Sequence, residues 1–218
     1  GDNFFDISKN IKDIDVSSFY KIQAAIEAVH SVSYTQMFEI VNNDNSFEDI
    51  LTPSIEKKRN FVIKYSSNNY TINEKITAFV FIEGVFFSVS FAIILWLRSR
   101  NKCPGITLAN EYIIRDETLH YLFGCLRLKD KVSYQDIEKI MNEAIDIEEE
   151  YCNEICSNNS IFIKDQLFSY TKYTVDLILS SLGFDKKYNV QLPFGFIDLQ
   201  YLPQITNFFE HHPTDYIL

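Results

Sequence analysis

Two Glu-x-x-His motifs stand on opposite sides of a long apolar run that carries one acidic residue at its middle. The residues concerned are Glu27, His30, Glu83, Glu117 and His120, with Glu83 inside the run from Ile76 to Trp96. Residues three apart lie on one face of an α-helix, so each motif can direct a carboxylate and an imidazole at the same point. A buried carboxylate needs an ion pair, a hydrogen bond or a metal. The pattern therefore predicts a metal site formed by three helical segments.

The low content of turn-forming residues favours long helices around this site. Only 6 glycines and 5 prolines occur among 218 residues, while 46% of the chain is hydrophobic. We predict a single all-α domain over residues 1–218, and paired Glu-x-x-His motifs are typical of ferritin-like dimetal bundles. The apolar run is long enough to cross a membrane, but a central carboxylate would be costly in lipid, so we assign the run to the bundle core.

Capping residues and helix breakers predict six helices. Their approximate spans are 19–41, 48 or 53 to 65, 73–100, 107–128, 133–156 and 162–182. Ser17 or Ser18 would cap the first helix, Ser133 with Asp136 would begin the fifth, and Gly183 would end the sixth. In straight antiparallel helices Glu83 and Glu117 would differ in depth by roughly 7 Å. We therefore expect an oblique crossing or a π-type distortion near the site.

Charge and cysteine usage restrict the remaining functions. The net charge of −10, with no cluster of Lys and Arg, argues against a nucleic-acid surface. The four cysteines show no regular spacing and no secretory leader is visible, so we expect reduced thiols and a cytoplasmic location. Cys152 and Cys156 are four residues apart on a predicted helix, which leaves a metal or redox pair as an alternative to free thiols.

The segments around the motifs carry a more specific pattern. They read FIEGVFFSVSF at 81–91, PG at 104–105, NE at 110–111 and RDETLH at 115–120. The pattern continues through residues 19–34 and ends in NFFE at 207–210 with Tyr216. These segments resemble the small, radical-generating subunit of class I ribonucleotide reductase, in its eukaryotic and viral branch. The resemblance covers nearly the whole chain.

The resemblance implies a role for each candidate residue. The implied iron ligands are Glu27, His30, Glu83, Glu117 and His120. Tyr34 would hold a stable phenoxyl radical, Asp116 would pair with His30 and assist radical transfer, and Tyr216 would relay the radical. Phe87, Phe91 and Ile113 would form an apolar pocket around the radical. From the residues alone, Tyr34 and the three apolar side chains can equally be core residues, Asp116 a surface ion pair and Tyr216 an exposed aromatic.

The implied activity is that of a ribonucleoside-diphosphate reductase small chain. A di-iron centre, with manganese as an alternative, would activate O₂ to form the tyrosyl radical that the large subunit uses to reduce ribonucleotides. A homodimer or a mixed small-subunit dimer is implied. Two rival interpretations remain: a paralogue that keeps the fold as a structural or regulatory partner without its own radical, and an iron-storage bundle.

The chain departs from the family pattern at its ends. The family's fourth carboxylate ligand and a tryptophan of its radical-transfer chain fall before the residue that matches Gly1. Its acidic-aromatic tail, which docks on the large subunit, would begin after Leu218. We therefore expect the sequence to be part of a longer protein.

Overall fold

A computed structural model describes residues 7–9, 11–42, 51–157 and 164–195 of the chain. Within these residues all regular secondary structure is helical, which confirms the all-α prediction. The helices are α2 (Ile14–Val41), α3 (Pro53–Ser66), α4 (Ile72–Val85), α5 (Ser88–Ser99), α6 (Pro104–Leu128), α7 (Tyr134–Ser157) and α8 (Lys164–Leu182).

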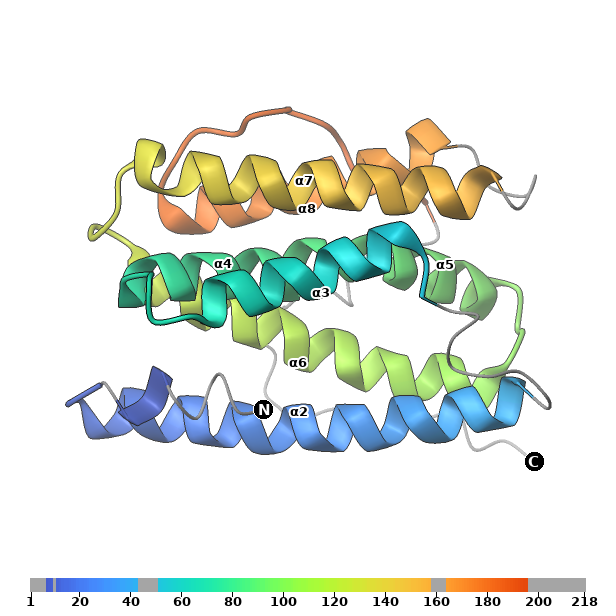
Figure 1. The fold of residues 1–218 in the computed structure, drawn as a ribbon. Helices are drawn as coiled ribbons and strands as arrows, with labels where there is room; N and C mark the ends of the chain where they lie inside the picture. The colour runs from blue at the N-terminus through green and yellow to red at the C-terminus, as the bar shows by residue number, and fades with distance from the viewer. Residues whose placement is uncertain (1–6, 10, 43–50, 158–163, 196–218) are drawn as a thin grey trace.

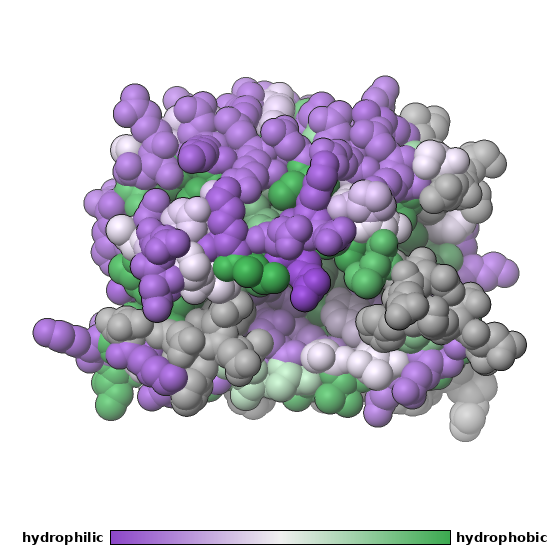
Figure 2. All heavy atoms as spheres, in the orientation of Figure 1, coloured by the Kyte–Doolittle hydropathy of each residue, from purple (hydrophilic) through white to green (hydrophobic). Residues whose placement is uncertain are grey.

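The helices form a layered bundle with α4 at its centre (Figure 1). α4 packs against α3, α6, α7 and α8, while α5 continues the same layer and packs against α6 and α8. α6 slants between the α4–α5 layer and α2, which lies at the outer edge with α6 as its main helix partner (Figure 1). The surface over α7 is mostly hydrophilic, whereas hydrophobic residues appear along α2 (Figure 2). The oblique crossing expected from the sequence is that of α6.

The apolar run forms the core of this bundle. Ten consecutive residues, from Ile76 to Val85, are buried. The stretch Ile72–Ser99 is long and apolar enough to cross a membrane, but 78% of its most apolar window is buried inside the protein. A helix that is apolar all round is what the centre of a bundle requires.

The predicted continuous helix over 73–100 is wrong, because the helix breaks at Phe86 and Phe87. The Phe86 N–H is shared between the carbonyls of Ile82 at 3.2 Å and Phe81 at 3.3 Å, so the last turn of α4 widens towards π-type hydrogen bonding. The break follows Glu83 by about one turn. A distortion therefore lies where the depth mismatch of the carboxylates predicted one.

The start of α2 also differs from the prediction. Asp13, and not Ser17 or Ser18, caps the helix, since its carboxylate accepts from the backbone N–H of Asp15 at 3.1 Å and of Val16 at 3.3 Å. The Ser17 hydroxyl donates to the Ser8 carbonyl at 3.1 Å instead. An acidic residue four positions earlier therefore takes the capping role from the serine.

Most other helix ends follow their capping residues. Ser133 and Asp136 form the predicted reciprocal cap at the start of α7, and Gly183 ends α8 with a φ of +89°. α6 begins at Pro104, three residues earlier than expected, because proline is well suited to the first turn. The alternative start at residue 48 and the expected start at residue 162 lie outside the described residues.

Candidate metal centre

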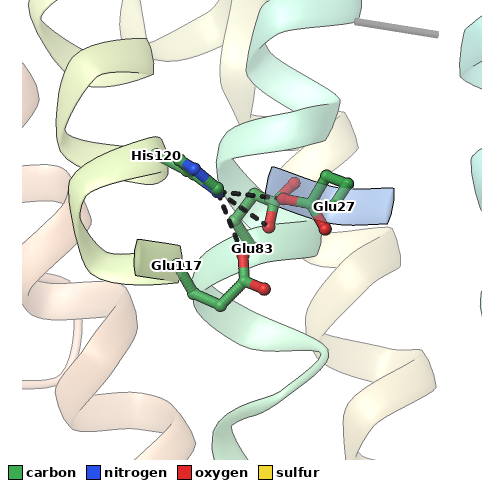
Figure 3. A group of neighbouring side chains, drawn as sticks. All are labelled: Glu27, Glu83, Glu117 and His120. Carbon is green, nitrogen blue, oxygen red and sulfur yellow. Dashed lines mark hydrogen bonds and ion pairs between the residues drawn. The ribbon is translucent and has the colours of Figure 1, made fainter. Parts of the chain in front are cut away.

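Side chains from α2, α4 and α6 meet inside the bundle (Figure 3). Glu27, Glu83, Glu117 and His120 each offer a ligand atom, and these four atoms lie within 4.8 Å of one another. Glu27 is half-buried, while the other three are buried. The His120 Nδ1 atom lies 3.0 Å from Glu27 Oε1, 3.3 Å from Glu117 Oε2 and 4.0 Å from Glu83 Oε2. The fold thus brings together four of the five predicted ligands in one cluster.

The fifth predicted ligand, His30, faces the same cluster from α2. Its Nδ1 atom lies 3.0 Å from Glu117 Oε1 and 3.6 Å from Glu27 Oε2, and its side chain is buried. The ring centroids of His30 and His120 are 6.3 Å apart. This separation lets each imidazole serve a different ion of a metal pair.

Asp116 lies behind His30, away from the cluster. The His30 Nε2 atom is 3.0 Å from Asp116 Oδ2, which is the pairing that the resemblance predicts. When the Nε2–H group donates to this carboxylate, Nδ1 is left with a lone pair that faces the cluster. Asp116 therefore orients the imidazole and raises its basicity, and it does not occupy a ligand position.

Two buried atoms of the cluster have close polar neighbours but no well-aligned hydrogen bond. Glu27 Oε1 lies 3.0 Å from His120 Nδ1 and His30 Nδ1 lies 3.0 Å from Glu117 Oε1, yet neither contact has the geometry of a regular hydrogen bond. Both belong to groups that bind metals, and both lie beside further carboxylate oxygens. A dimetal centre held by Glu27, His30, Glu83, Glu117 and His120 would satisfy them. The donor set of carboxylates with two imidazoles suits iron or manganese.

The ionisable groups of the cluster perturb one another strongly. Burial raises the pKa of Glu83 well above its usual range, and the charge of Glu117 adds to this effect. Burial opposes ionisation of Glu117 too, but hydrogen bonds with Glu83, His120 and His30 lower its pKa to about 2. Burial disfavours the charged form of His30, yet hydrogen bonds to carboxylates, first of all Asp116, raise its pKa to about 11. Protons therefore balance the negative charge, and a metal must displace them.

Tyr34 lies one helical turn after His30 on α2. Its ring is partly buried against the hydrophobic core. Burial raises the pKa of the Tyr34 phenol, and the charges of Glu117, Glu27 and Glu83 raise it further. The phenol is therefore protonated at neutral pH and lies within the electrostatic field of the cluster.

The other predicted residues have less defined surroundings. Phe87 and Phe91 stack at a centroid distance of 5.5 Å, and Ile113 is buried in the core. Phe91 lines a cavity of about 40 Å³ that also borders Glu83 and Glu117. That these three residues enclose a radical on Tyr34 stays a prediction. Tyr216 lies outside the described residues, and its relay role stays a prediction as well.

Two glycines that belong to neither Glu-x-x-His motif shape the site. A Cβ atom on Gly84, directly after Glu83, would lie 2.6 Å from Ile178 Cδ1 on α8. A Cβ atom on Gly124, one turn after His120, would lie 2.4 Å from Val80 Cγ2 on α4. The absence of side chains at these positions lets α4 approach α8 and α6 closely. Sequence reasoning missed both residues, although glycines inside otherwise strong helical patterns were an available signal.

The helical bundle and its carboxylate–histidine cluster together define a ferritin-like protein of the dimetal-carboxylate type. Residues 2–193 match the family described as ribonucleotide reductase, small chain. The chain is 36% identical to a ribonucleoside-diphosphate reductase small chain of Arabidopsis thaliana, over 96% of this chain and 67% of that one. It is 35% identical to the small chain of variola virus, over 91% of this chain and 65% of that one. The chain belongs to the ribonucleotide reductase small-chain family.

Solved structures agree with this assignment. The ribonucleotide reductase Rnr4 homodimer from Saccharomyces cerevisiae is 28% identical, with a TM-score of 0.77 over 89% of this chain and 65% of that chain. Dimanganese(II)-NrdF of Streptococcus sanguinis shares the fold with a TM-score of 0.77 at 18% identity, over 92% of this chain and 76% of that chain. The prediction of a ferritin-like bundle is confirmed. The chain spans about two thirds of the length of the curated Arabidopsis and variola virus small chains.

Proposed function

We propose that this chain acts as the small subunit of a ribonucleoside-diphosphate reductase and forms a radical on Tyr34. The observation that carries the proposal is the convergence of five ligand-type side chains on one buried cluster, with a protonated phenol one turn away. Family membership supplies the substrate class: the radical would pass to a large subunit, which would reduce ribonucleotides there. Nucleotides are not expected to bind to this chain.

The metal would be held by the five residues of the cluster, as iron or, in the alternative, as manganese. When bound, the dimetal centre would supply the oxidising power, drawn from O₂, that removes one electron from Tyr34. Zinc would lack this capacity because it has no redox chemistry. Asp116 would keep the Nδ1 lone pair of His30 directed at the metal and would take part in radical transfer.

The protein's own residues would protect and transmit the radical. Phe87, Phe91 and Ile113 would exclude water and reductants from the phenol. Tyr216 would relay the radical towards the large subunit. Burial of the Tyr34 phenol, which raises its pKa, requires its proton to leave together with the electron. A nearby carboxylate is the natural acceptor for that proton.

The proposed partners follow from family membership. They are the large subunit and a second small subunit, as a homodimer or a mixed dimer. We propose a cytoplasmic location, which suits four cysteines that are all free thiols. The net charge of −10 supports a protein partner over a nucleic acid.

The test is radical formation after loading with Fe(II) and O₂. A sharp phenoxyl absorption band and an EPR signal are expected, and Tyr34→Phe should abolish both while retaining the bound iron. Tyr20→Phe is the matched control, because Tyr20 is a buried tyrosine of the same helix and should leave the signal intact. Bound iron without any radical would favour the structural paralogue, and assembly into a mineral-filled shell would favour iron storage.

A further inference from the structure

The break between α4 and α5 releases backbone groups that an unbroken helix would pair. In a continuous helix the Val89 N–H would donate to the Val85 carbonyl. Here the Val89 N–H donates to Glu148 Oε1 on α7 at 3.2 Å, and the Val85 carbonyl accepts from the Ser88 hydroxyl at 2.7 Å. Side chains therefore replace the missing helical hydrogen bond on both sides of the break.

A side chain of α3 also bonds to a backbone group at the break. The Lys58 ammonium donates to the Phe86 carbonyl at 2.6 Å and lies 2.5 Å from Glu148 Oε2. It also lies 3.8 Å from the centroid of the Tyr151 ring. Lys58 and Glu148 thus form one pair that supplies a donor to the end of α4 and an acceptor to the start of α5.

The burial of this pair argues for a geometric role. Glu148 has an exposed fraction of 0%, and the Lys58 side chain has one of 16%. The desolvation of such a pair offsets much of its attraction, so it contributes little to net stability. Burial raises the pKa of Glu148, and the charge of Lys58 opposes the rise. What the pair does contribute is a fixed position for two backbone groups.

The placement of the Glu83 side chain depends on the geometry of this break. Glu83 lies on the last turn of α4, directly before the break, while α5 is held separately against α6 and α8. A wide turn inserts one residue into the helix and so rotates the preceding turn by about 100° relative to the following one. The geometry of the break therefore sets the direction and depth of the Glu83 carboxylate.

We propose that Lys58 and Glu148 are positioning residues of the metal centre, which hold the α4–α5 break and so keep Glu83 level with Glu117 and His120. This inference rests on the proposed metal centre. Glu148 lies in a run of three acidic residues that resembles a solvated surface. It continues the buried face of α7, however, one turn after Ala144.

The chain offers a matched control on the same two helices. Lys64 of α3 and Glu143 of α7 form an ion pair at 2.7 Å, and their side chains have exposed fractions of 37% and 31%. Neither residue contacts the break in the described structure. Removal of this pair disturbs the α3–α7 contact but leaves the groups around Glu83 untouched.

The experiment is titration of the full chain with Co(II), followed by absorption spectroscopy. Lys58→Met combined with Glu148→Leu should weaken Co(II) binding about 10-fold and change the Co(II) spectrum. Glu148→Gln keeps an oxygen acceptor for the Val89 N–H, so it should weaken binding less than about 3-fold. Lys64→Met with Glu143→Gln should match the parent protein in affinity and spectrum.

A folded double variant with the parent's affinity and spectrum would overturn the proposal. If that variant does not fold, Ser88→Ala decides, because it removes one hydroxyl that lies 2.7 Å from the Val85 carbonyl, 3.4 Å from Glu148 Oε1 and 2.8 Å from the Thr171 hydroxyl. It should weaken Co(II) binding about 3-fold, and unchanged binding would overturn the proposal. Amide hydrogen exchange over residues 84–91 in the metal-free protein gives an independent measurement: it should accelerate in these variants and not in the control. A parent protein that binds no Co(II) contradicts the proposed metal centre itself. The hydrogen-exchange rates then test only whether Lys58 and Glu148 stabilise the α4–α5 break.

Discussion

Helices α2 and α4 both supply carboxylates to the same cluster, yet they are packed in opposite ways. Ten consecutive residues of α4 are buried, whereas only five of the 28 residues of α2 are. Several apolar residues of α2, including Ile22, Val29 and Ile40, are exposed. A helix can therefore carry ligands either as the core of the bundle or as its outer edge. The position of Glu83 depends on packing all round α4, while that of Glu27 depends on the single inner face of α2.

The largest expected effect comes from shortening a buried side chain of α4, in comparison with an exposed side chain of α2. Phe81→Ala on α4, where the side chain has an exposed fraction of 0%, should lower the free energy of unfolding by about 3–5 kcal/mol, because it leaves a cavity. Val29→Ala on α2, exposed at 63%, should change it by less than about 0.5 kcal/mol. Urea unfolding of the metal-free protein measures both. Equal losses would show that α2 is as tightly packed as α4.

A smaller loss of stability is expected when a methyl group is added where two helices are in close contact. Gly124→Ala places a methyl group against the stiff side chain of Val80, so we expect a loss of about 1–3 kcal/mol and weaker metal binding. Gly105→Ala is the control on the same helix, since no atom lies within 4 Å of its Cβ position. Because alanine is the better helix former, this control should be neutral or more stable by up to about 1 kcal/mol. Thermal unfolding distinguishes the two, and a harmless Gly124→Ala would contradict the close approach of α4 and α6.

The smallest expected effect is a difference between the Glu83 and Glu27 carboxylates in how they change the stability of the metal-free protein. The raised pKa of Glu83 means that, above its unfolded value of 4.5, the metal-free protein loses stability as pH rises. Glutamine imitates the protonated form, so Glu83→Gln should stabilise the metal-free protein at pH 7. Burial raises the pKa of Glu27, but hydrogen bonds with His120 and His30 lower it below its usual value of 4.5. The ionised Glu27 therefore stabilises the folded protein above pH 4.5, and Glu27→Gln should lower the free energy of unfolding at pH 7.

Each of these changes should be on the order of 1 kcal/mol. Urea unfolding at pH 7 and pH 5 is the measurement, and the gain from Glu83→Gln should shrink at the lower pH because the unfolded state then begins to bind the proton as well. Both substitutions should weaken metal binding. A stability loss at pH 7 from Glu83→Gln would contradict burial of a protonated carboxylate.

Much of the fold and most residues of the carboxylate–histidine cluster were predictable, since both rest on local patterns. Helical periodicity, the reciprocal cap at Ser133 and the stop at Gly183 act over a few residues, so they indicate helices without knowledge of the partners. The Glu-x-x-His spacing likewise places Glu117 and His120 on one face. The break at Phe86 was not predicted beyond a distortion near the site, since the side chains that bond to its backbone groups come from α3 and α7.

The sequence by itself determined that the chain forms long helices and that each Glu-x-x-His motif presents a carboxylate and an imidazole on one helix face, because both properties follow from the period of the α-helix. Only the tertiary structure decided how α4 breaks beside Glu83, where Lys58 and Glu148 are placed and which face of α2 stays exposed. These features depend on contacts between residues some 30 to 90 positions apart, such as Lys58 with Phe86 and with Glu148. No periodic pattern along one helix encodes such contacts, because they arise when separate helices pack.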